Sequence, residues 1–98
     1  MFGPTRQEVL RMKLDQLRPL VQRALAIDDW PGDWEVAGSI LENGYFNFQR
    51  ANTGEQLFGI TLFGQRANGT GIDEDPLVAI FKAYILLFME ESELRRRV

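Results

Sequence analysis

The chain has 98 residues, 45% of them hydrophobic, and a formal net charge of −3 at pH 7 from 11 basic and 14 acidic side chains. A chain of this length can bury enough surface for one hydrophobic core, so we expect a single domain over residues 1–98. It contains no cysteine and no histidine, which excludes disulfide frameworks, zinc sites, cysteine nucleophiles and Ser-His-Asp triads.

The first segment predicts one long amphipathic helix, from Thr5 to about Ile27. Thr5 and Glu8 have the spacing of a capping box, which marks the start of a helix. The helix ends before the Pro31-Gly32 pair, because this pair cannot continue it. Apolar side chains recur at helical spacing along one face, at Leu10, Leu14, Leu17, Val21 and Ala24.

The middle of the chain predicts a three-stranded antiparallel meander, because its short segments are rich in aromatic and β-branched residues. The expected strands are Trp34–Leu41, Tyr45–Arg50 and Gln56–Phe63. Three-residue loops, Glu42-Asn43-Gly44 and Asn52-Thr53-Gly54, keep the apolar residues on one face and set Phe48 opposite Phe58. This expected core face carries Trp34, Val36, Ile40, Phe46, Phe48, Phe58, Ile60 and Leu62.

The last third of the chain predicts a polar connector, Gln65 to Asp75, and a second long helix, Pro76 to about Arg96. Asp75 suits the N-cap of this helix, and Pro76 suits its first helical position. Two helices side by side are wide enough to cover three strands. We therefore expect an α+β domain of order α-β-β-β-α, with two helices packed on one face of the meander.

The second helix is apolar almost all round, since twelve of the thirteen residues from Leu77 to Met89 are apolar or aromatic and Lys82 is the exception. Two interpretations fit this pattern. The helix is either central, between the sheet and the first helix, or it leaves one side for a second copy in a two-fold dimer. In the second case we expect the dimer interface at Val78, Ile85, Leu86 and Met89.

The other face of the predicted sheet carries very little charge for a solvated surface. Leu41, Tyr45, Thr61 and Phe63 gather toward one end of it in the expected register. These residues are either singly exposed apolar side chains, which are common, or a contact face for a protein partner, anchored by Tyr45 and Phe63.

Acidic residues surround Trp30 and Trp34, at Asp28, Asp29, Asp33 and Glu35. Helix capping and solubility explain most of them, and their spacing is not that of an EF-hand calcium loop. The alternative is an acidic surface that contacts a basic partner, including by imitating nucleic-acid phosphates.

We therefore expect a non-catalytic protein–protein interaction module, a small adaptor, chaperone or inhibitor, that is homodimeric and needs no cofactor or metal. No apolar run is long enough to span a bilayer, so we expect a cytoplasmic protein without membrane contact. The same order of elements occurs in double-stranded-RNA-binding domains, which carry basic residues at the start of the second helix. Asp73, Glu74 and Asp75 occupy that place here, so we expect no direct binding of nucleic acid.

Two other functions fit the sequence. The first is an acidic inhibitor of the kind that bacteriophages carry, anti-CRISPR-like or a nucleic-acid mimic, that blocks a nucleic-acid-handling complex. The second is a small hydrolase that acts through carboxylates, for which Asp33 and Glu35 are the candidates.

Overall fold

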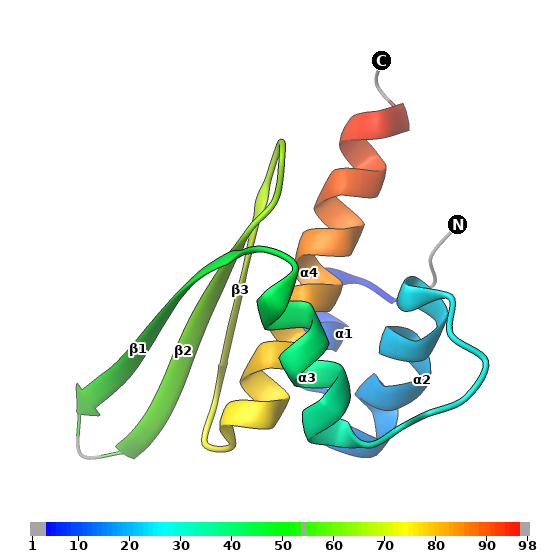
Figure 1. Cartoon of the computed structure of the whole chain (residues 1–98). Helices are drawn as coiled ribbons and strands as arrows, with labels where there is room; N and C mark the ends of the chain where they lie inside the picture. Colours follow the sequence, from blue (N-terminus) through cyan, green and yellow to red (C-terminus); the bar gives the residue numbers. More distant parts are fainter. Residues whose placement is uncertain (1–3, 54, 97–98) are drawn as a thin grey trace.

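The computed structural model describes residues 4–53 and 55–96. Its helices are α1 (Arg6–Leu10), α2 (Leu14–Leu25), α3 (Asp33–Glu42) and α4 (Pro76–Arg96), and its strands are β1 (Tyr45–Thr53), β2 (Glu55–Phe63) and β3 (Asn68–Asp73). The strands form one antiparallel sheet in the order β1-β2-β3 (Figure 1). The predicted α+β fold, a three-stranded meander between helical segments, is confirmed.

The first helical segment is broken into α1 and α2, so the prediction of one continuous helix is wrong. The amide oxygen of Gln16 accepts a hydrogen bond from the backbone N–H of Lys13 at 2.9 Å, which satisfies a donor at the start of α2. The break changes which side chains face inward. Val9 is fully buried, whereas Leu10, which the continuous helix places on the apolar face, is 49% exposed.

The predicted strand Trp34–Leu41 is a helix, α3. Val36, Ala37 and Ile40 are buried, at the spacing of one helical face. Val36 and Ile40 are four residues apart, which satisfies a period of two as well as a helical turn, so the apolar pattern of this segment fits both structures. Trp34, which the strand places on the core face, is 58% exposed on α3.

The predicted connector, residues 65–75, contains β3, which pairs with β2 along its whole length. The meander is therefore made of the two later predicted strands and this third one. Gly69 and Gly71 of β3 lie directly against α4. A Cβ atom at either position would overlap backbone atoms of α4, so only glycine allows the helix and the strand to approach this closely.

The pairing of β1 with β2 confirms two predicted strands but corrects their register. Phe48 lies opposite Ile60 rather than Phe58, because the pairing is centred on residue 54 instead of residue 53. The predicted loop includes Gly54, which lies outside the described residues. The shift moves each partner by two positions, so every side chain keeps its face, and Ile60 and Leu62 are buried as expected.

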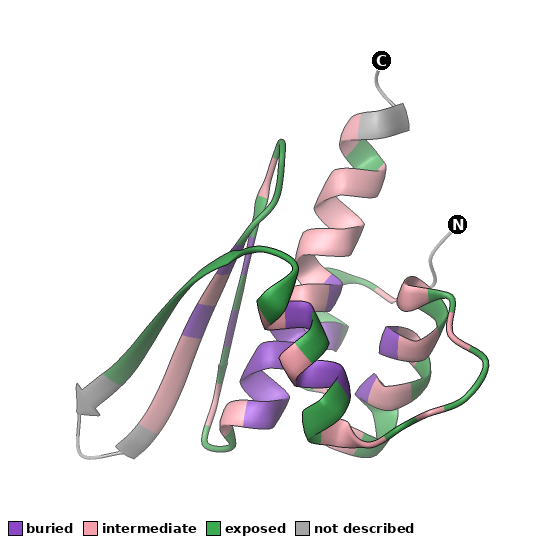
Figure 2. Ribbon diagram, viewed as in Figure 1, coloured by how far each residue is buried: buried purple, intermediate pink, exposed green. Residues whose placement is uncertain are grey.

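Helix α4 lies between the sheet and the other three helices (Figure 1). It contacts β2 and β3 on one side and α1, α2 and α3 on the other, and its first half is buried (Figure 2). Lys82, the exception in its apolar stretch, is 4% exposed, and its Nζ lies 3.1 Å from Oδ1 of Asp73. The central position explains why α4 is apolar on nearly all sides, and it leaves the first helical segment behind α4 rather than on the sheet.

Candidate functional site

The sheet has one face turned away from α4, which we call the outer face. It is opposite the face on which Ile60 and Leu62 are buried. The described residues of the outer face are Tyr45, Asn47 and Gln49 of β1, Leu57, Gly59, Thr61 and Phe63 of β2, and Asn68, Thr70 and Ile72 of β3. None of these residues is charged, and three large apolar side chains are exposed, Tyr45 by 84%, Ile72 by 53% and Phe63 by 42%.

Three of the four residues predicted to bind a partner come together on the outer face. Tyr45 lies directly opposite Phe63 in the β1–β2 register, and Thr61 lies between the neighbouring strands, with its Oγ1 2.9 Å from Oγ1 of Thr70. Leu41 does not join them, because it is a half-buried residue of α3. Ile72 belongs to this surface as well. The sequence does not place it there, because its segment is predicted to be a connector and not a strand.

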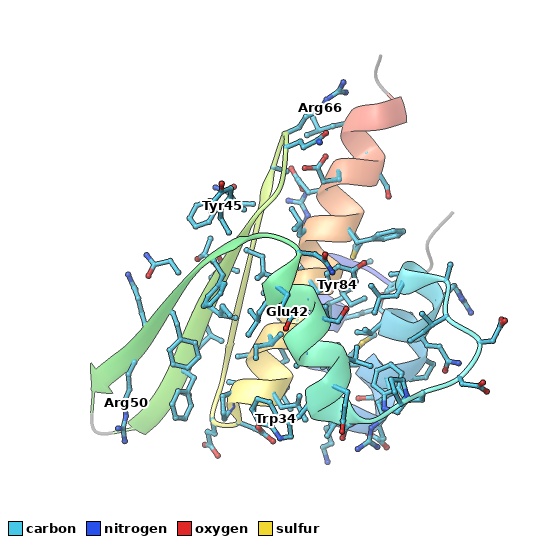
Figure 3. The ribbon with its side chains drawn as sticks, viewed as in Figure 1. Trp34, Glu42, Tyr45, Arg50, Arg66 and Tyr84 are labelled. Atoms are coloured by element: carbon cyan, nitrogen blue, oxygen red, sulfur yellow. The ribbon has the colours of Figure 1, made fainter. Side chains whose placement is uncertain are left out.

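The inner face of the β1–β2 hairpin, on the same side of the sheet as α4, carries exposed aromatic side chains on β1. Figure 2 shows the first part of β1 as exposed. Phe46 and Phe48 are 48% and 45% exposed although they share this face with buried Ile60. The ring centroids of Phe48 and Phe58 are 5.7 Å apart, and the Arg50 guanidinium lies 5.7 Å from the Phe58 centroid. Figure 3 shows Tyr45 and Arg50 at opposite ends of β1, which extends away from the helices.

The predicted acidic surface is divided by the structure. Both carboxylate oxygens of Asp33 accept hydrogen bonds from Arg18, at 2.8 and 2.7 Å, and Oδ1 accepts a third from the Trp30 indole N–H at 2.9 Å. The bonds from Arg18 and Trp30 lower the pKa of Asp33 below its usual range. Asp33 therefore joins α2 to the start of α3, while Asp28, Asp29 and Glu35 are exposed.

The residues predicted for a dimer interface lie along α4. Val78 and Ile85 are 7% and 0% exposed, so they belong to the core of the chain and offer almost no surface to a second copy. Leu86 and Met89 are half-buried. A dimer through α4 would therefore have two partly exposed side chains in place of the predicted four.

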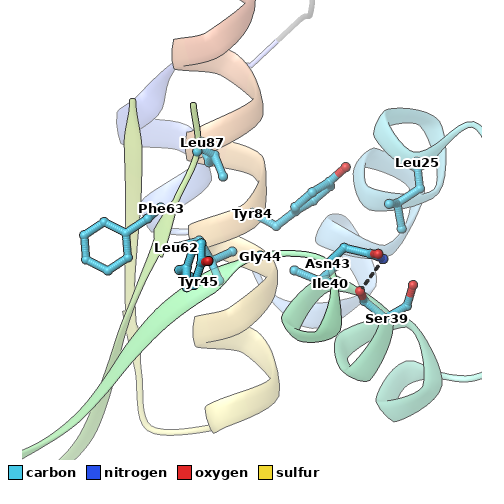
Figure 4. Close-up of a pocket in the computed structure, with 11 residues that line it drawn as sticks. Leu25, Ser39, Ile40, Asn43, Gly44, Tyr45, Leu62, Phe63, Tyr84 and Leu87 are labelled. Atoms are coloured by element: carbon cyan, nitrogen blue, oxygen red, sulfur yellow. Dashed lines mark hydrogen bonds between the residues drawn. The ribbon is translucent and has the colours of Figure 1, made fainter. Parts of the chain in front are cut away.

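A pocket of about 240 Å³ opens between the end of α3 and the middle of α4 (Figure 4). Its lining is Leu25, Ser39, Ile40, Asn43, Gly44, Tyr45, Leu62, Phe63, Gly64, Tyr84 and Leu87. The Asn43 amide donates a hydrogen bond to the Ser39 carbonyl oxygen at 2.8 Å, and burial raises the pKa of the Tyr84 phenol. Neither Asp33 nor Glu35, the candidates for hydrolysis, lines this pocket.

Among the described residues, no three acidic side chains are grouped so that they could hold a metal ion, and no helix is both long and apolar enough to cross a membrane. Comparison of the chain with models of known families, with curated proteins and with solved structures gave no significant match.

Proposed function

We propose that this protein is a non-catalytic protein-binding module, a small adaptor, chaperone or inhibitor, whose partner contacts the outer face of the sheet. The observation that supports it is the pair formed by Tyr45 and Phe63, two exposed aromatic side chains opposite each other on an uncharged sheet face. Contiguous exposed apolar surface marks interaction sites, and aromatic residues are enriched at the centres of interfaces.

The polar residues of the outer face suit the same role. Asn47, Gln49 and Thr61 offer neutral hydrogen-bonding groups, which are less costly to remove from water than ionised groups. Pairing of the three strands fixes the backbone beneath Tyr45 and Phe63, so a partner does not have to order that backbone on binding.

The test is affinity capture from a lysate of the source organism, followed by identification of the retained proteins. We expect the wild type and a control variant, Trp34→Ser, to retain the same partner, because Trp34 is exposed on α3 and lies outside the outer face. The double variant Tyr45→Ser/Phe63→Ser should lose it while keeping the thermal unfolding midpoint. Capture that is equal for the wild type and the double variant would contradict the proposal.

The alternative function, an acidic inhibitor that contacts a basic surface, is favoured by the exposure of Asp28, Asp29 and Glu35. The two functions differ in their response to salt. Contact through the apolar outer face should survive a wash at about 1 M salt, where the Debye length is about 3 Å, and contact through carboxylates should not. Loss of the partner in Asp28→Asn/Asp29→Asn, with retention in Tyr45→Ser/Phe63→Ser, would establish the inhibitor function instead.

A further inference from the structure

β1 is an edge strand that lacks the usual protection against pairing. It is nine residues long, and its free edge has no strand partner among the described residues. Natural proteins protect such edges with proline, lysine, bulges or a covering helix. β1 contains no proline or lysine, and its one charged residue is Arg50. The opposite edge, β3, has six residues, lies against α4, ends in Asp73 and continues into two further acidic residues, Glu74 and Asp75.

We propose that β1 pairs antiparallel with β1 of a second copy and forms a two-fold dimer whose two sheets become one continuous sheet. The two-fold axis of such a pair is perpendicular to the sheet, so both outer faces lie on one side and both inner faces on the other. Residues directly opposite each other then point to the same side of the sheet. Even-numbered residues must therefore pair with even-numbered ones, and odd-numbered residues with odd-numbered ones.

One of these registers suits the aromatic residues of the inner face. With Asn47 on the two-fold axis, Phe46 of each copy lies opposite Phe48 of the other copy. Directly opposite aromatic residues stabilise antiparallel strands. The pairing covers two side chains that are 48% and 45% exposed in the single chain. On the outer face the same register sets Asn47 opposite its own copy, which brings no like charges together.

The charges near β1 are complementary in this register. Arg50 lies opposite Gly44 of the second copy, two residues from Glu42, which is exposed at the end of α3. Glu42 ends α3 shortly before β1 begins, and Figure 3 shows Arg50 toward the other end of β1. Antiparallel pairing brings Arg50 of one copy close to Glu42 of the other. Because of the two-fold symmetry, this pair occurs twice in the dimer. A second copy therefore matches this edge in aromatic register and in charge.

The first test is the mass of the protein in solution, measured by light scattering after size exclusion. We expect the wild type to have twice the chain mass of 11.3 kDa. Asn47→Lys should weaken the dimer about tenfold, because it places two like charges opposite each other at the axis. The matched control is Asn68→Lys, the same change at an exposed outer-face position of β3, and it should leave the dimer unchanged.

The second test examines the register. The chain has no cysteine, so Asn47→Cys introduces a single thiol. Opposite residues of antiparallel strands have Cα atoms about 4.5–5.5 Å apart, which suits a disulfide. We expect Asn47→Cys to form a disulfide-linked dimer on mild oxidation much faster than Asn68→Cys. We also expect Arg50→Glu to weaken the dimer and Glu42→Arg/Arg50→Glu to restore it.

Several results would overturn the proposal: a wild-type monomer at every concentration reached, a dimer that Asn47→Lys leaves intact, or equal cross-linking at positions 47 and 68. If the wild type is a monomer and Asn47→Lys abolishes the capture of a partner, the edge of β1 pairs with a strand of that partner instead. The inference concerns the edge of β1 and does not rest on the proposed function of the outer face. A monomer that still captures a partner would refute the dimer alone, and a dimer that captures none would refute the proposed function alone.

Discussion

β3 and β1 flank the same central strand, yet α4 lies against β3 and leaves β1 uncovered. On the side of α4, β3 presents Gly69 and Gly71, whereas β1 presents Phe46 and Phe48. A helix is about 10 Å wide and strands are about 4.8 Å apart, so one helix covers about two strands. The glycines determine which two are covered, because α4 can approach most closely where the strand has no side chains.

The first prediction uses glycine to compare the β3–α4 contact with the exposed hairpin. Gly71→Ala should lower the free energy of unfolding by about 3 kcal/mol, because the added Cβ would overlap backbone atoms of Ala79 and Ala83. Gly59→Ala makes the same change on β2, where the Cβ would lie 3.8 Å from the carbonyl oxygen of Gln49, an ordinary contact. It should cost less than about 1 kcal/mol. Urea denaturation measures both, and equal losses would contradict the comparison.

The second prediction compares two residues that lie opposite each other on the inner face, Ile60 and Phe48, which are 1% and 45% exposed. Ile60→Ala should lower the free energy of unfolding by about 2–3 kcal/mol, because it leaves a cavity under α4. Phe48→Ala removes more atoms but should cost less than about 1 kcal/mol, since water already reaches the ring. Urea denaturation measures both losses, at protein concentrations low enough to keep the chain monomeric. A larger loss for Phe48→Ala than for Ile60→Ala would contradict the prediction and show that the Phe48 ring is packed in the folded monomer.

The third prediction concerns the ion pair of Lys82 and Asp73. Asp73→Asn should lower the free energy of unfolding by about 2 kcal/mol, because it leaves the ammonium group of a 4% exposed lysine without its counter-charge. Lys82→Met removes the buried charge and keeps the length of the side chain, so it should cost less than about 1 kcal/mol. Thermal and urea unfolding check both. A larger loss for Lys82→Met than for Asp73→Asn would contradict this prediction. It would mean that the charge of Lys82 itself stabilises the folded chain.

The smallest effect is expected at acid pH. The hydrogen bonds from Arg18 and Trp30 lower the pKa of Asp33 in the folded chain, so the ionised carboxylate favours folding. This contribution is complete above the pKa of an unfolded carboxyl group, about 3.9, and is lost as the pH falls through the lower pKa of the folded state. Asp33→Asn and Arg18→Met should both flatten the decline of stability below about pH 4, measured by urea unfolding. A decline parallel to that of the wild type would contradict the assigned cause.

The elements that could be predicted from the sequence are those with signals inside their own residues. α4 has its cap and its continuous apolar stretch, and β1 and β2 have apolar residues at every second position, at Phe46 and Phe48 and at Phe58, Ile60 and Leu62. β3 has no such signal, because Gly69 and Gly71 are needed by a helix that follows them in the chain. In α3, Val36 and Ile40 fit both periods, and the choice between helix and strand depends on burial against α4.

The outer face was partly predictable because side chains alternate strictly along a strand. An error of two positions in pairing keeps every residue on its face, so the predicted grouping of Tyr45, Thr61 and Phe63 holds although the predicted register is wrong. Leu41 does not belong to this face because its segment is the helix α3, and Ile72 belongs to it because the predicted connector contains the strand β3. The coverage of the inner face could not be predicted, since it depends on where a helix distant in sequence docks.

The place of α4 in the chain has a consequence for biosynthesis. α4 contacts α1, α2, α3, β2 and β3, and all of them precede it in the sequence. A ribosome synthesises the chain from its N-terminus, so residues 4–75 emerge before the helix that covers their apolar side chains. The pairings of β1 with β2 and of β2 with β3 can be completed in that interval, since both are local in sequence. The nascent chain thus exposes Leu17, Val36 and Ile60 until α4 has left the ribosome, and during this interval the chaperones of the cell can bind it.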